Sequence, residues 1–348
     1  MVDPKPRQGS KKPDVNRRDE IRLLNAKTCF AKSSRRLESR GAFGLMIKTT
    51  IADAKFSPGR LTARVIGSVL IISGFIHMTL WAIEGSAWSG PLSLRKPILF
   101  GLSGGVTVLS VAWVFGKLRK IWGDEWISCA FGVAMLVEVG LITIQQWRGV
   151  PSHFNRATTL DAAILIGMEA MISFASLVIV YVMVRCFRPL HAEPDVALAI
   201  RGGMLLLALS CAIGFGLVFF GHQQISLGKN PELYGQSGVV KFPHGMPMHA
   251  IQFLPALAWL LRKVRVDSDR RYREVAYGLS AIVGMTCFSL MQTLSGRARF
   301  DLTPSSAVVF GVSTLLLSKP LLTLLLSCSR IFVRSLLSPT DESLRTTT

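Results

Sequence analysis

The sequence predicts an all-α fold, a polytopic bundle of about eight transmembrane helices. Half of the 348 residues are apolar, and the mean hydropathy is +0.41. Only 18% are charged, whereas soluble domains carry about 25%. Long apolar runs alternate with short basic gaps, which is typical of polytopic membrane proteins. Helices satisfy the backbone of such runs in a bilayer, and the alternating pattern of a membrane barrel is absent.

Residues 1–60 are predicted to form a basic, disordered cytoplasmic tail. They hold 15 Lys or Arg against 6 Asp or Glu, together with several prolines and no apolar periodicity. No apolar h-region follows the early positive charges, so the segment is not a secretory signal. A second interpretation, slightly favoured, is that translation starts at Met46 and leaves a short basic leader. Residues 330–348 are predicted to form a short cytoplasmic tail.

The transmembrane helical domain is expected at residues 61–329. Most of its apolar runs exceed the roughly 18 residues needed to cross a hydrocarbon core. The sixth run is short and contains Pro247 and Pro255, so we expect it to be kinked or partly re-entrant. The eight predicted spans are Ala63–Glu84, Pro97–Leu118, Ile127–Trp147, Asp161–Arg185, Leu198–Gly221, Met248–Leu261, Ala276–Leu294 and Ser305–Cys328.

The distribution of Lys and Arg predicts the orientation. The connections after the second, fourth and sixth spans are rich in basic residues, and the other connections hold two each. The positive-inside rule then places both termini in the cytoplasm, in what we expect to be a bacterial cytoplasmic (inner) membrane. The net charge of +19 follows from the same residues, which border apolar runs. The lipid bilayer is therefore the expected partner, and nucleic acid is not.

Short matches between the two halves suggest an internal duplication. The third span ends Gln145-Gln146-Trp147-Arg148-Gly149, and the seventh ends Gln292-Thr293-Leu294-Ser295-Gly296. Ile72-Ser73-Gly74-Phe75 in the first span likewise resembles Ile213-Gly214-Phe215 in the fifth. The offsets fit a four-plus-four repeat, whose halves would be parallel because each has an even number of spans.

Ionisable side chains, which cost free energy to place in a hydrocarbon core, gather in the outer halves of the predicted spans. At 1.5 Å per residue, His77, Glu138 and Glu169 lie about 10–14 Å below the outer ends of three different helices. A carboxylate at mid-membrane costs at least about 2.5 kcal/mol, so such a group faces a partner, a cavity or a ligand. Glu138 and Gln145 are seven apart and share a helix face. The alternative is that Glu138 and Glu169 are protonated or hydrogen-bonded and only hold helices together.

Polar side chains of the outer loops add to this predicted site. The 148–161 connection is dense in hydrogen-bonding groups. Arg95 lies at the outer start of the second span, where it would either extend to the membrane interface or attract an anion. Five of the six histidines are external or in the outer half. The predicted solute-binding residues are His77, Arg95, Glu138, Gln145, Arg148, His153, Asn155, Glu169, His249, Gln252 and Gln292.

Three functions remain open from the sequence. The first is a small-molecule or ion transporter, or a receptor-like permease, with an outward-facing pocket; Glu138 or Glu169 would exchange protons, and Arg95 and Arg148 would hold an anionic group. The second is a membrane oxidoreductase whose b-type haem or metal is held by His77 with His222 or His249. No HExxH motif supports a metal. The third is a non-catalytic membrane scaffold. No catalytic residue is assigned.

Overall fold

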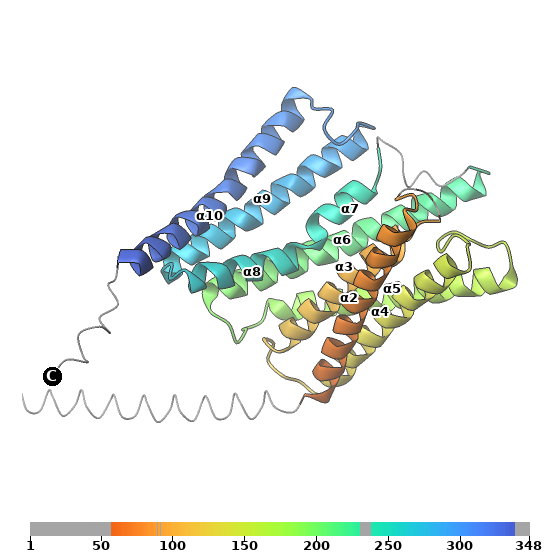
Figure 1. Cartoon of the computed structure of the whole chain (residues 1–348), viewed down its shortest axis with the longest axis horizontal. Helices are drawn as coiled ribbons and strands as arrows, with labels where there is room; N and C mark the ends of the chain where they lie inside the picture. The colour runs from red at the N-terminus through yellow and green to blue at the C-terminus, as the bar shows by residue number, and fades with distance from the viewer. Residues whose placement is uncertain (1–56, 89, 91, 230–237, 338–348) are drawn as a thin grey trace, which may run out of the picture. The chain divides into compact units, whose positions relative to one another are not determined.

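Residues 57–88, 90, 92–229 and 238–337 are described by a computed structural model of the chain, with side chains up to residue 330 (Figure 1). The chain divides into two units, 1–57 and 58–348. The predictions for the N-terminal tail, including the alternative start at Met46, and for residues 338–348 lie outside the described residues.

The described residues contain no strand and fold into nine helices. Seven of them are long and apolar enough to cross a membrane, which confirms the predicted polytopic helical bundle. The helices are α2 (Pro58–Glu84), α3 (Arg95–Phe115), α4 (Asp124–Trp147), α5 (Thr159–Cys186), α6 (Pro194–Ser226), α7 (Lys241–Met248), α8 (Ala250–Lys263), α9 (Ser268–Leu294) and α10 (Pro304–Leu337).

Polar residues and prolines set several helix starts. The hydroxyl of Thr158 caps α5 by accepting a hydrogen bond from the backbone N–H of Asp161, and Asp267 caps α9 in the same way. The helix α2 begins at Pro58, five residues before the predicted span, because proline suits the first turn of a helix. Hydropathy marks only the apolar, membrane-spanning part of α2, whereas the helix itself extends into the polar residues before it.

The sixth predicted span is broken, as the two prolines indicated. The helix α7 ends at Met248, and α8 begins at Ala250. His249 between them departs from helical geometry, with φ −94° and ψ 10°. Pro247 lacks the backbone N–H that a continuous helix would use at this point. The second half of the bundle therefore has a short helix followed by a longer one where the first half has α3.

The two halves of the bundle, α2–α5 and α6–α10, repeat one packing order. In the first half, α2 packs mainly on α3; in the second, α6 packs on α7 and α8. The third helix, α4 or α9, contacts the first, second and fourth helices of its half. This recurrence agrees with the predicted four-plus-four repeat. The halves meet mainly where α5 packs on α6, with a smaller contact between α3 and α8.

Glycines allow the first two helices of each half to approach closely. A Cβ on Gly67 of α2 would lie 2.9 Å from the carbonyl oxygen of Gly105 in α3. A Cβ on Gly203 of α6 would lie 2.7 Å from the Cα of Ile251 in α8. Small residues at helix contacts let backbones pack together where the hydrophobic effect cannot drive association.

The connections lie at two opposite ends of the bundle (Figure 1). We call one the His153 end; its described residues are 85–88, 90, 92–94, 148–158, 227–229, 238–240 and 295–303. The other is the Arg185 end, with 116–123, 187–193 and 264–267. Hydrogen bonds join connections within each end, for example Gly238 to Arg297 and His191 to Lys117.

Large apolar side chains cover the outside of the helices. Leu177, Val308 and Leu325 are 69%, 64% and 68% exposed. A water-soluble protein would bury such a set, whereas lipid tails solvate it. The chain is an integral, multi-pass membrane protein.

Candidate functional site

The loop 148–158 reaches from the first half of the bundle to the second at the His153 end. The ring of Phe154 lies against Gly221 of α6, so closely that a Cβ there would be 2.4 Å from the ring. The same ring meets His222 edge-on, with 5.1 Å between centroids. The neighbouring His153 ring lies 5.8 Å from that of Phe100 in α3. The loop thus occupies the junction between α3 and α6.

A chain of three polar side chains fixes the loop to α3. Lys96 donates from Nζ to the hydroxyl of Ser152 at 3.1 Å, and that hydroxyl lies 2.9 Å from Nδ1 of His153. Ser152 is only 2% exposed. An ammonium only donates, so the Ser152 oxygen accepts from Lys96. The tautomer of His153 decides whether the same hydroxyl donates to Nδ1 or accepts from it.

Lys96 and Lys241 lie near enough to His153 to act on its charge, and Arg95 lies near enough to act on both lysines; we call these three residues the cationic group. Lys241 begins α7 in the second half, and its ammonium is close enough to Arg95 and Lys96 to be repelled by both. All three side chains are half-buried. Burial, and then the charges of Lys96 and Lys241, lower the pKa of His153 to about 3, so the imidazole is neutral at physiological pH.

Carboxyl groups approach the same junction from α4 and α5. Glu169 pairs with Nε2 of His222 at 2.7 Å, and His222 borders Phe154. Glu138 is 2% exposed, and its Oε2 has no hydrogen-bond partner among the described residues. Its carboxyl group is near enough to that of Glu169 to interact electrostatically. Glu138 of α4, Glu169 of α5 and His222 of α6 therefore form a series of neighbouring ionisable side chains that ends beside the loop 148–158.

Gln145 and Arg148 belong to a separate hydrogen-bonded group. Arg148 donates to Asp161 at 2.8 Å and also to the amide oxygen of Gln145. The Gln145 amide donates to Asp161 at 3.1 Å, and Thr158 donates to the other Asp161 oxygen at 2.7 Å. Gln145 is fully buried. This group ties the end of α4 to the start of α5.

Gln292 has the corresponding position in the second half. It is 1% exposed and donates to the backbone carbonyls of Ala298 and Asp301, each at 2.9 Å. Like Gln145, it closes the loop that follows the third helix of its half. The structure thus gives both glutamines hydrogen-bond partners that do not include the cationic group: Gln145 bonds to Arg148 and Asp161, and Gln292 bonds to the backbone of the loop after α9.

The other predicted residues lie in different surroundings. Both ring nitrogens of His77 are occupied: Nδ1 lies 2.7 Å from the Ser73 carbonyl, and Nε2 accepts from Trp147 at 3.1 Å. His249 is exposed at the helix break, 3.4 Å from the Ser103 hydroxyl. Gln252 of α8 donates to Thr107 of α3 at 3.4 Å, which joins the two halves, whereas Asn155 makes a local contact and accepts from the backbone of Ala157 at 3.1 Å.

The predicted metal ligands are not brought together. His77, His222 and His249 are engaged with Trp147, Glu169 and Ser103 respectively. Within the described ranges, no group of three or more His, Cys, Asp or Glu side chains is placed to hold a metal ion.

The Arg185 end has its own buried ion pairs. Asp124 of α4 pairs with Arg185 of α5, and both side chains are less than 10% exposed. Arg271 of α9 pairs with Asp195 and Glu193 at the start of α6, each at 2.7 Å. The sequence interpretation did not single out these residues. The signal was available, because the predicted spans begin or end beside these charges.

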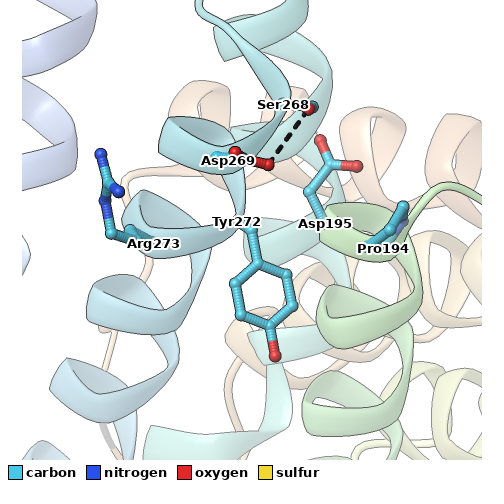
Figure 2. A pocket seen from close by; sticks show the side chains of 6 residues that line it. All are labelled: Pro194, Asp195, Ser268, Asp269, Tyr272 and Arg273. Carbon is cyan, nitrogen blue, oxygen red and sulfur yellow. Dashed lines mark hydrogen bonds between the residues drawn. The ribbon is translucent and has the colours of Figure 1, made fainter.

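A depression of 410 Å³ adjoins this ion-pair cluster (Figure 2). A second one, of 400 Å³, lies at the outside of α4 near Arg148. Neither is lined by the cationic group, whose junction is filled by the loop 148–158. The first depression is lined by Pro194, Asp195, Ser268, Asp269, Tyr272 and Arg273.

The sequence analysis missed Lys241 and Phe154 as members of the site. Lys241 follows a long connection, and nothing in the sequence places it beside Lys96, 145 residues earlier. Phe154 was part of a polar loop and carried no chemical signal.

No protein-family model, curated protein or solved structure matches the chain. A functional interpretation therefore has to be built from its own residues.

Proposed function

We propose that the protein binds a small solute at the His153 end and carries it across the membrane. The observation that supports this most directly is the junction itself. Ser152, His153 and Phe154 of one loop contact α3 in the first half and α6 in the second. Transporters built from repeats place their solute sites at the interface between the repeats, where the two halves can move relative to each other.

The backbone of the loop supports a role in motion. Phe154 has φ 61°, a left-handed conformation that is rare for a bulky aromatic residue. Such local strain is found where neighbouring contacts hold a residue in place, and it clusters at ligand clamps and switch segments. Release of Phe154 from Gly221 would open the space between α3 and α6 to a solute.

The charge distribution along the sequence supports an outer position for the His153 end. When the adjoining helix ends are counted with the connections, the Arg185 end holds twelve Lys and Arg residues and the His153 end holds eight, and cytoplasmic loops are the richer ones. The cationic group then faces the compartment from which a solute would be taken up. Glu138, Glu169 and His222 provide groups that exchange protons within the membrane, a common feature of coupled carriers.

A scaffold without a ligand is the competing function. It would explain Gln145 and Gln292, because Gln145 joins the end of α4 to the start of α5 and the partners of Gln292 lie within the loop that follows α9. It does not explain why three basic residues gather at an end that the sequence makes poor in positive charge.

A thermal-shift screen of the purified full chain in nanodiscs tests the proposal. Unfolding is followed by tryptophan fluorescence against carboxylates, phosphates, amino acids, sugars, nucleosides and inorganic ions. A ligand at about 100 times its Kd stabilises by about 2.7 kcal/mol, which raises the unfolding temperature of a large domain by roughly 5–11 °C. We expect at least one compound to shift the wild type and to lose its effect in His153→Ala.

The matched control is His191→Ala, an exposed histidine at the Arg185 end. It should retain the shift. A panel with no active compound, or one whose effect is equal in both variants, would favour the scaffold.

A further inference from the structure

We propose that Glu138 is the proton-binding residue of the carrier and that it is uncharged at neutral pH. The inference rests on the proposed function, because it decides which of the ionisable side chains within the membrane takes up the proton. It is carried by the burial of this carboxyl group in the middle of α4, and by the lack of a hydrogen-bond partner for its Oε2 among the described residues.

The first observation is the position of Glu138 within the membrane-spanning part of α4. At 1.5 Å per residue, it lies about 21 Å from the start of the helix at Asp124 and about 14 Å from its end at Trp147. The side chain is 2% exposed, so it has lost nearly all contact with solvent. An ionised carboxylate at this position would give up its hydration and gain no hydrogen bond at Oε2.

The second observation is that Glu138 differs from the other buried carboxyl groups. Each of the other four in the described residues lies beside an arginine. The pairs are Asp124–Arg185, Asp161–Arg148, Asp195–Arg271 and Glu274–Arg270. An arginine stabilises the ionised form of a buried carboxyl group, and removing one partner of such a pair leaves an uncompensated charge. Among the described residues, Glu138 has no such pair.

The helices that pack on α4 do not supply the missing charge. They are α2, α3 and α5. The charged residues of α3, Arg95 and Lys96, are confined to its start at the His153 end. In α2, the ionisable group nearest to mid-membrane is His77, whose Nε2 accepts a hydrogen bond from Trp147. Neither helix places a cation at the depth of Glu138.

The third helix, α5, brings a second carboxyl group to a similar depth. A Cβ on Gly167 of α5 would lie 3.5 Å from the side chain of Leu141 in α4, and Glu169 and Glu138 follow these two residues within one turn. Glu169 is paired with His222 at 2.7 Å, and the two side chains are 35% and 33% exposed. The pair lies between Glu138 and the loop 148–158, so it gives a proton a route to the His153 end.

The uncharged form of Glu138 therefore has the lower free energy. A neutral carboxyl group without a partner forgoes hydrogen bonds, whereas a carboxylate also forgoes the hydration of a full charge. A single carboxyl group can bind a proton by itself, whereas Ca²⁺ or Mg²⁺ needs several oxygen ligands at once. The cation that suits an isolated, buried glutamate is a proton.

Infrared spectroscopy of the purified full chain tests the inference. The carbonyl stretch of a protonated carboxyl group is separate from the bands of amides and carboxylates, and it shifts when deuterium replaces the proton. Maltoside micelles are used because this detergent has no carbonyl group of its own. Spectra are recorded at neutral pH in H₂O and in D₂O for the wild type, Glu138→Gln and Glu169→Gln. The control is Glu84→Gln, which alters an exposed glutamate at the end of α2.

We expect a protonated-carboxyl band in the wild type that is lost in Glu138→Gln and kept in Glu169→Gln and Glu84→Gln. The band should shift in D₂O, because a proton-binding residue exchanges its proton with water. A second measurement uses only the wild type and so does not depend on the folding of a variant. Dicyclohexylcarbodiimide, which attacks protonated carboxyl groups in apolar surroundings, should label Glu138, as located by mass spectrometry of the peptides.

Three results would overturn the inference. Identical spectra of Glu138→Gln and the wild type, with no label on Glu138, would mean that this residue is ionised. Loss of the band in Glu169→Gln alone would assign the proton to Glu169. A band that does not shift in D₂O would make Glu138 a sealed structural acid. None of these measurements uses a solute, so the inference and the thermal-shift screen of the proposed function can fail separately.

Discussion

Lys96 and Ser152 are linked by a hydrogen bond of 3.1 Å between the start of α3 and the loop that follows α4. The contact matters because Ser152 in turn orients His153. Replacement of Ser152 by Ala would remove the acceptor of a half-buried ammonium. Bonds to charged groups contribute about 1.5–3 kcal/mol, so we expect a loss of about that size in the free energy of unfolding.

Reversible unfolding in mixed micelles measures this loss. Ser68→Ala is the control, because the Ser68 hydroxyl bonds only to the backbone of its own exposed helix turn. If the two substitutions were equally mild, the Lys96–Ser152 bond would have no part in holding the loop.

Two glycines of α6 should respond in opposite directions to alanine. Gly221→Ala would bring a methyl group within 2.4 Å of the Phe154 ring, so the loop must move or the helix must shift. We expect a lower unfolding temperature. Gly216 has open space around its Cβ position, and Gly216→Ala should stabilise by up to about 1 kcal/mol through helix propensity. Thermal unfolding of both variants tests the packing of Phe154 on Gly221. Equal shifts of the unfolding temperature in the two variants would contradict that packing.

The pKa of His153 predicts how stability changes with pH. The unfolded chain takes up a proton on this residue near pH 6.5, and the folded chain does so only near pH 3. Between these values the unfolded state binds more protons, so this contribution to stability is lost as the pH falls. His153→Gln, which does not titrate, should therefore lose less stability than the wild type from neutral pH to about pH 5.

Unfolding temperatures at the two pH values measure this difference, with exposed His191→Gln as control. Identical pH dependence in His153→Gln and the wild type would mean that His153 is not held neutral.

The buried pair at the Arg185 end should be far more sensitive than its neighbour. Asp124→Ala would leave the Arg185 guanidinium buried without its carboxylate, at a cost of about 3–5 kcal/mol. Glu125→Ala removes a partly exposed partner of Arg60 and Lys120, with an expected cost below about 1 kcal/mol. Chemical denaturation compares the two variants. Similar costs would show that Asp124 and Arg185 are not a buried pair.

The fold was largely predictable because its signals are local. Each apolar run needed only its own residues to indicate a helix, and Pro247 and Pro255 indicated the break now seen at His249. Helix ends were less predictable. Pro58 and Leu337 extend α2 and α10 beyond their apolar runs, where hydrophobicity gives no signal.

The site depended on contacts that a single sequence does not contain. The sequence identified Arg95, His153 and Glu169 as costly polar groups, and all three lie near the junction. The sequence analysis assigned Arg148 and Gln145 to the same site. In the structure these two side chains bond to each other and to Asp161 instead. Lys241 joins the site only because α7 lies beside α3. That contact follows from how the two halves of the bundle pack.

The central claim is that the loop 148–158, and with it the His153 end, lies on the outer side of the membrane. The most direct measurement labels single cysteines, in a cysteine-free background, with a membrane-impermeant maleimide in intact cells. Asn155→Cys reports the loop 148–158, and His191→Cys reports the Arg185 end. We expect Cys at 155 to react in intact cells and Cys at 191 to react only after permeabilisation. Reaction at 191 but not at 155 in intact cells would contradict the account.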